Sequence, residues 1–255
     1  MATAICVISA FSSPVGDSLN TDEIVRKAVA RAEATQAASA QRDFTYTKVT
    51  VLEELDPSGN VKERKETVYE VLFQGGSTHL KLIQVDGHDP SQADLKKMAD
   101  NDATVQKLLA DSKNKAAPRD NFLTRDLVAR YDFKFIGHEP VNGREAYQVT
   151  FQPKNPELPT HHFVDRLLNR LSGTLWIDAQ EFEVARADVS LKSEVKLLGG
   201  LVASLKKAAY SMTRTRVAEG VWVNTSSRGD FQGRKLMDDM RIKLKSHSSN
   251  FKQLG

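Results

Sequence analysis

The feature that most constrains the fold is an alternation of apolar and polar residues with a period of two. Tyr69, Val71 and Phe73 fall on one side of such a pattern, and Glu66 and Glu70 fall on the other. Successive side chains of a β-strand point to opposite faces, so the pattern predicts strands that each bury one face. Strands are predicted over the segments 44–55, 61–74, 79–86, 132–138, 144–152, 173–178, 182–192, 207–218, 221–232 and 236–247.

Turn-forming residues separate these segments. Asp56-Pro57-Ser58-Gly59-Asn60 and Gly75-Gly76 are typical of tight turns, and Asn142-Gly143 suits a two-residue type I′ hairpin. Strands joined by short turns pair with their neighbours in sequence and run antiparallel. We therefore expect one antiparallel sheet, without parallel pairs.

Helical spacing interrupts the strand pattern in a few places. A helix is predicted over 20–40, where Asn20 or Thr21 can cap the N-terminus and Ile24, Ala28 and Ala32 form an apolar stripe. Further helices are predicted over 93–110, over 121–131 and after Pro159, the last with an apolar side of Phe163, Leu167, Leu168 and Leu171. The expected fold class is mainly β (α+β): a single sheet with helices covering one face.

Charge and composition limit the classes of partner that the chain is expected to bind. The net charge is +3, from 36 Lys+Arg against 33 Asp+Glu, and the charges are interspersed. Nucleic-acid binding usually needs a clustered basic face, so we expect no nucleic-acid partner. After the N-terminal residues no segment approaches the ~18 consecutive apolar residues of a membrane helix, so the chain is not expected to span a membrane.

Catalytic signatures are missing from the sequence. There is no nucleophile elbow, phosphate-binding loop, dinucleotide fingerprint or zinc-protease motif. His161 and His162 are adjacent and diverge on a helix, and Asp238 and Asp239 point to opposite sides of a strand. We therefore expect a protein that is not an enzyme, with no metal and no cofactor.

The N-terminal residues resemble the end of a secretory signal. Residues 4–11 are mostly apolar, small residues follow, and Ala10 and Ser12 suit cleavage after Ser12, although no basic residue precedes Arg26. We expect cleavage between about residues 10 and 18. Residues 1–16 are then a signal peptide, residues 17–255 form a single domain, and the mature protein lacks the chain's one cysteine, Cys6.

Three short motifs carry a resemblance to a known family. Gly173–Val189 contains Gly-Thr-Leu-Trp-Ile-Asp, a turn, and Phe-Glu-Val-Ala-Arg-Ala. Gly137–Tyr147 has the pattern G-x-E-x-V-x-G-x-x-x-Y, and Gly220–Asn224 resembles a strand start of the form G-V-W-l-P, with Asn224 in place of proline. In this order they resemble the bacterial outer-membrane lipoprotein-sorting proteins (LolA/LolB-like), and in particular an uncharacterised exported branch, over roughly residues 20–247.

The resemblance implies a half-barrel, in which one curved antiparallel sheet holds helices in its concavity. In the sorting proteins that concavity shields lipoprotein acyl chains in the periplasm. The expected localisation is therefore the periplasm of a Gram-negative-type bacterium, and the expected partner is a lipid or the acyl chain of a lipoprotein. The family's functional arginine matches no residue here, so no residue role is carried over.

Aromatic and aliphatic side chains are the candidate ligand contacts. Paired glycines inside the apolar run 195–205 favour a bend or a mobile rim at the mouth of a cavity, although the run could equally complete the core. The aromatic residues likewise either pack in a core or line a ligand-binding face. The candidates are Phe44, Tyr46, Tyr69, Phe73, Phe133, Phe135, Trp176, Leu197, Leu198, Leu201, Val202 and Leu205.

Two functions remain open. The first is a carrier or chaperone in envelope biogenesis that binds a hydrophobic ligand. The second is an interaction or sensor module that binds an envelope protein in the same concavity. Neither is enzymatic.

Overall fold

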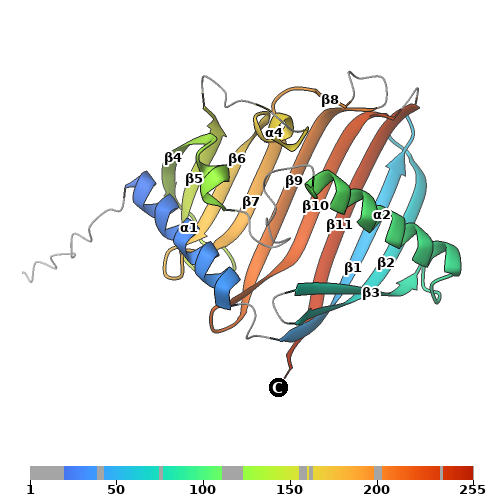
Figure 1. Ribbon diagram of the computed structural model, residues 1–255, viewed down its shortest axis with the longest axis horizontal. Helices are drawn as coiled ribbons and strands as arrows, with labels where there is room; N and C mark the ends of the chain where they lie inside the picture. Colours follow the sequence, from blue (N-terminus) through green and yellow to red (C-terminus); the bar gives the residue numbers. More distant parts are fainter. Residues whose placement is uncertain are drawn as a thin grey trace, which may run out of the picture.

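A computed structural model describes residues 20–38, 43–74, 77–110, 123–154, 160, 163–197, 203–235 and 238–254. Its dominant element is one 11-stranded sheet, which is not closed into a barrel (Figure 1). The strands are β1 (Phe44–Leu55), β2 (Val61–Gln74), β3 (Ser77–Val85), β4 (Tyr131–His138), β5 (Ala146–Pro153), β6 (Leu171–Asp178), β7 (Val184–Leu191), β8 (Val195–Leu197), β9 (Ala203–Ala218), β10 (Val221–Lys235) and β11 (Asp238–Gln253).

The strand order is β3-β2-β1-β11-β10-β9-β7-β6-β5-β4, with the short β8 paired to β9. Every pairing is antiparallel, which confirms the expected single sheet. Most neighbours in sequence are also neighbours in the sheet. The exceptions are β3 and β4, which form opposite edges, and β7 and β8, because β7 pairs with β9 instead. In addition, β1 pairs with β11 as well as with β2.

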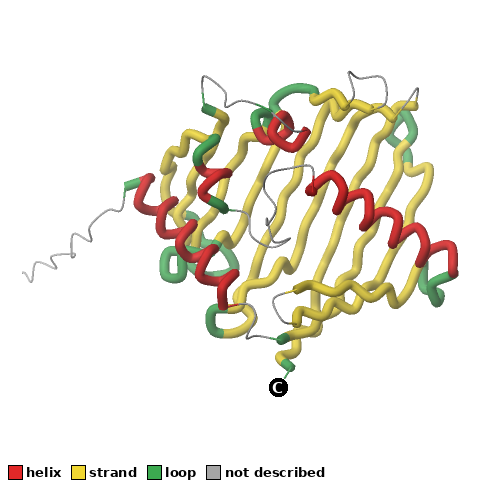
Figure 2. Tube along the Cα trace, in the orientation of Figure 1, coloured by secondary structure: helices red, strands yellow, loops and turns green. Residues whose placement is uncertain are grey.

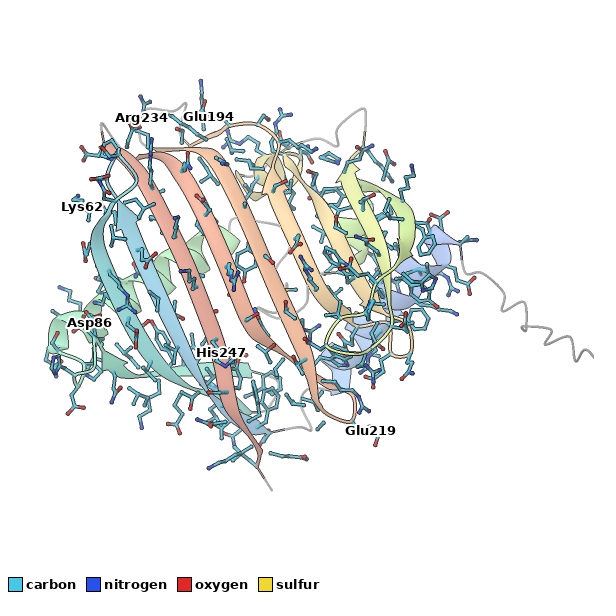
Figure 3. All side chains as sticks on the ribbon, turned by 180° about the vertical axis from the view of Figure 1, so that it is seen from behind. Lys62, Asp86, Glu194, Glu219, Arg234 and His247 are labelled. Atoms are coloured by element: carbon cyan, nitrogen blue, oxygen red, sulfur yellow. The ribbon has the colours of Figure 1, made fainter. Side chains whose placement is uncertain are left out.

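The helices are α1 (Thr21–Ala38), α2 (Gln92–Ala110), α3 (Arg125–Val128) and α4 (Phe163–Leu168). α1 and α2 lie across one side of the sheet, which we call the helix face (Figures 1 and 2). The opposite outer face carries side chains such as His247 that extend into solvent (Figure 3). Within the described residues, no helix is long and apolar enough to cross a membrane.

Helix ends follow local capping chemistry. The backbone N–H of Glu23 donates to the Asn20 side chain, so Asn20 caps α1. Ser91 and Asp94 form a reciprocal capping pair at the start of α2.

The helix predicted over 121–131 is too long, because Thr124 caps a helix that covers only Arg125–Val128 and Tyr131 already begins β4. Leu171, expected on the last helix, instead begins β6.

The hydrophobic core lies between α1 and one half of the sheet. Ile24, Val25, Ala28 and Val29 of α1 are buried, which confirms the predicted stripe except at the half-buried Ala32. Most of these strands supply alternate residues to the core, because alternate side chains point to the same face, and a register shift between β6 and β7 separates Val184 from Ala187. These strand residues are Val149, Leu175, Ile177, Val184, Ala187 and Met212.

A buried ion network fixes the C-terminal half of α1 to the sheet. Glu183 follows the β6–β7 turn, and its side chain is only 5% exposed. One of its oxygens accepts hydrogen bonds from Arg31 at 3.1 Å and from Thr35 at 2.8 Å, both on α1. The other oxygen accepts from Arg214 of β9 at 2.8 Å. Arg214 also donates to the carbonyl of Trp222, so the network joins α1, β7, β9 and β10.

The three sequence motifs meet at one end of the strands. Arg144, in the first motif, makes a double hydrogen bond with Asp178 of the second, at 2.7 and 2.9 Å. Its guanidinium also lies 5.6 Å from the ring centre of Trp222, in the third motif. Trp176 and Trp222 are buried together with Val141, Ala146 and Ala185. Asn142 and Gly143 both have positive φ, at 51° and 76°, as the expected type I′ turn requires.

We expect Asp178→Asn to lower the free energy of unfolding at pH 7 by roughly 1–3 kcal/mol, because Arg144 loses a charged partner. Burial raises the pKa of Asp178, but hydrogen bonds from Arg144 and from the backbone outweigh it and leave this pKa below its ordinary value. A carboxylate with a lowered pKa stabilises the fold above its unfolded-state pKa and loses that effect as pH falls. The difference in free energy of unfolding between the wild type and Asp178→Asn should therefore shrink below about pH 4.

Urea denaturation at several pH values measures this difference. Asp132→Asn is the control, because Asp132 is an exposed aspartate on β4. A stability difference between the wild type and Asp178→Asn that stays constant down to pH 2 would contradict the prediction.

We also expect Glu183→Gln to destabilise the fold by about 3 kcal/mol or more, because it leaves the buried Arg214 without its counter-charge. Thermal denaturation followed by circular dichroism should show a fall in Tm on the order of 10 °C. Glu54→Gln is the matched control, since Glu54 pairs with Lys62 in solvent. Equal melting temperatures for the two variants would disprove the role given to Glu183.

Candidate functional site

A cluster of aromatic rings lies on the helix face outside the α1 core. Phe44 stacks on Phe73 with ring centres 4.8 Å apart and on Tyr46 at 6.1 Å. Tyr46 in turn contacts Phe251 of β11 at 5.2 Å. We call these four residues the aromatic cluster. All four are only half-buried, so their rings are partly open to solvent.

The face on which the aromatic cluster lies follows from strand alternation. Phe73 and Lys65 are an even number of residues apart on β2, so they point to the same side. The Lys65 ammonium donates to Asp94 of α2 at 2.6 Å. The aromatic cluster therefore faces the side on which α2 lies.

A small pocket joins the aromatic cluster to the end of the ion network. It is lined by Phe44, Tyr46, Phe73, Thr78, Arg214, Trp222, Val223 and Asn224. Its enclosed part measures about 20 Å³, enough for roughly one water molecule. The strands that form it are β1, β2 and β3 on one side and β9 and β10 on the other, so strands from distant parts of the sequence build it together.

The polar end of the pocket holds a paired charge. Arg214 is the only charged residue among the described lining residues, and it forms an ion pair with Glu183. The amide oxygen of Asn224 is buried, and it accepts no hydrogen bond from any residue that the structure describes. Most buried polar atoms in proteins have a partner, so this oxygen needs an explanation.

The helix α2 covers this half of the sheet loosely. It crosses the helix face in front of β11, β1 and β2 (Figure 1). Between Gln92 and Asp100 only Asp94 and Met98 are half-buried, and the other side chains are exposed. Hydrogen bonds from Lys65 and Ser91 lower the pKa of Asp94 to about 2, so this carboxylate is ionised at neutral pH. The Lys65–Asp94 contact thus ties the helix to β2.

The predicted ligand contacts fall into separate groups. Phe44, Tyr46 and Phe73 line the pocket. Tyr69 lies farther along β2 on the same face, opposite Lys48. Phe133 and Phe135 instead pack against the core beneath α1. Trp176 lies on the other side of the sheet from its core neighbours Leu175 and Ile177.

The predicted rim is only partly visible. Val195 pairs with Leu205 and Leu197 pairs with Ala203, so the two ends of the run form a short hairpin ladder. Val195 is buried and Leu205 is half-buried. Leu198, Leu201 and Val202 lie outside the described residues, so the rim stays a prediction.

Sequence reasoning missed several residues of the pocket: Thr78, Arg214, Trp222, Val223 and Asn224, together with Phe251 of the aromatic cluster. One signal pointed to Asn224, since it replaces the proline of the G-V-W-l-P pattern. No sequence signal pointed to Arg214, because an arginine among polar strand residues cannot be distinguished from a surface arginine. Across the ranges that the structure describes, no group of three or more His, Cys, Asp or Glu side chains could hold a metal ion.

Comparisons with known proteins give similarity only at the level of structure. No family model matches the chain, and no curated protein matches it. Among solved structures, the chain is similar to a LolA superfamily protein from Nitrosomonas europaea, with 10% identity, coverage of 92% of this chain and 94% of that one, and a TM-score of 0.35.

Two further solved structures are similar over most of their length. One is an outer membrane lipoprotein-sorting protein domain from Vibrio parahaemolyticus, with 10% identity, coverage of 90% and 93%, and a TM-score of 0.33. The other is a DUF1329 family protein from Desulfovibrio piger, with 12% identity, coverage of 89% and 92%, and a TM-score of 0.32. Because these TM-scores lie below 0.5, we draw no functional conclusion from them.

Proposed function

We propose that the chain binds a hydrophobic ligand, a lipid or the acyl chain of a lipoprotein, on the helix face and carries or chaperones it in the bacterial envelope. The observation that carries this proposal is the aromatic cluster, which lines a pocket and stays half-exposed on the face that α2 crosses. Large half-exposed apolar surfaces with a few polar groups are typical of ligand sites. The sequence motifs support the same function.

In this proposal a ligand extends from the pocket along the helix face, and α2 has to move to make room for it. The enclosed pocket volume of about 20 Å³ is far below the several hundred Å³ of a typical small-molecule site. The exposed first half of α2 gives up little apolar contact when it leaves the sheet. An acyl chain that takes its place gains about 0.8 kcal/mol per buried methylene. In this proposal α2 is a cover that the ligand displaces.

The proposal includes a setting and a division of the chain. Residues 1–16 would direct export, and residues 17–255 would form one ligand-binding domain in the periplasm. No reaction is assigned to it, since the pocket lining contains neither a carboxylate nor a histidine.

A second candidate is a protein partner that binds the same face. The small enclosed volume favours it, because a peptide side chain needs less space than a lipid. Native mass spectrometry of protein purified from its own periplasm separates the two candidates. A bound lipid mass supports the carrier, and a stoichiometric protein complex without lipid supports the partner.

The aromatic cluster and the α1 core should respond differently to truncation. We expect Phe73→Ala to weaken the binding of dodecylpyrene, a fluorescent hydrocarbon probe, at least fivefold while Tm changes little, because Phe73 lines the pocket and is half-exposed. Phe133→Ala should lower Tm by several degrees, since it removes core packing, yet leave binding per folded molecule unchanged. The reverse pattern would place the ligand beneath α1.

The contact between Lys65 and Asp94 should slow ligand entry. We expect Lys65→Met to raise the association rate of the probe about two- to fivefold in stopped-flow fluorescence, because an ion pair of this kind is weak. In the wild type the rate should stay constant from pH 7 to pH 4, since Asp94 has a pKa of about 2 and remains ionised. Lys81→Met, which removes an exposed pair with Glu70, is the control. Equal rates in all three proteins would argue against α2 as the cover.

A further inference from the structure

The pocket combines an apolar wall with one unpaired acceptor. Phe44, Tyr46 and Phe73 form the wall, and Asn224, whose amide oxygen is buried without a described partner, lines the other side. A buried acceptor that is left without a donor is unfavourable relative to one that is paired. A ligand that supplies a donor at this point recovers that cost in addition to its apolar burial.

The charges around the pocket select against ionic head groups. An anion would gain little from Arg214, because its guanidinium already donates to Glu183 and to the carbonyls of Val184 and Trp222. A carboxylate would also place an acceptor against the Asn224 oxygen. A cation would find no carboxylate among the described lining residues and would lose its hydration.

We propose that the pocket recognises the uncharged, hydrogen-donating head of an amphiphile, such as a hydroxyl or an amide N–H, which donates to the Asn224 amide oxygen while the apolar chain lies along the aromatic cluster. This inference rests on the proposed function and adds the class of head group to it. The donor keeps its hydrogen on binding, and no bond is made or broken.

Four amphiphiles with the same chain test this inference at pH 8 by displacement of dodecylpyrene: dodecanol, dodecyl methyl ether, dodecanoate and dodecylamine. Dodecanol should bind about tenfold more tightly than the ether, which has an acceptor but no donor, because a site with a buried hydrogen-bonding group rejects analogues that leave it unpaired. Dodecanoate and dodecylamine should bind more weakly than dodecanol.

Variants at Asn224 separate the head-group contact from general apolar binding. Asn224→Leu should reduce the preference for dodecanol over the ether to less than twofold. Gln232→Leu is the matched control, because it also replaces an amide side chain with leucine on the same strand, at a position outside the pocket lining, and it should keep the tenfold preference. Asn224→Asp keeps the shape and the acceptor, so it should retain the preference and improve dodecylamine binding even if Asn224→Leu folds poorly.

The possible failures are distinguishable. Equal affinity of the wild type for dodecanol and the ether, or tighter binding of the ether, would overturn the head-group inference and leave hydrophobic binding intact. A wild type that binds neither dodecylpyrene nor any of the four amphiphiles would overturn the proposed function itself.

Discussion

The carboxylate of Glu183 is the interaction on which the rest of the arrangement depends. It is almost fully buried, and it holds Arg31 and Thr35 of α1 on one oxygen and Arg214 of β9 on the other. A buried charge with fewer partners would be costly, so α1 has one favourable position against the sheet. The same carboxylate forms an ion pair with Arg214 at the wall of the pocket. The attachment of the helix and the electrostatics of the pocket therefore have a common origin.

The sequence motifs and the candidate site overlap only at the start of β10. Arg144 and Asp178 form a double hydrogen bond, and Trp176 is buried with Trp222, at the ends of the strands where the hairpins meet. Trp222, Val223 and Asn224 belong both to a motif and to the pocket lining. The other motif residues serve strand connection, so a resemblance that rests on them says more about the sheet than about the ligand. The aromatic wall of the pocket lies on strands without any motif.

The fold was largely predictable because its determinants are local. Alternation marks the strands, Asn142-Gly143 sets its hairpin, and the stripe of Ile24 and Ala28 marks the buried side of α1. The pairing of β1 with β11 was not predictable, since nothing local in 44–55 points to residues at the other end of the chain. That pairing decides which aromatic residues share a face with Arg214 and Asn224. Periodicity therefore found Phe44, Tyr46 and Phe73, and it could not separate them from Phe133 and Phe135, which have the same pattern and serve the core.

The pairing of the first strand, β1, with the last strand, β11, forms a seam in the sheet and affects the order of folding. Phe44 is opposite Gln253 across that seam, so the two walls of the pocket come together only when nearly the whole chain is present. Contacts between residues so distant in sequence carry a large loop-closure entropy and form late. The strands from β4 to β9 can pair through local hairpins before this happens. A growing chain thus lacks the complete pocket, and its aromatic residues stay without that surface until the C-terminal strand arrives.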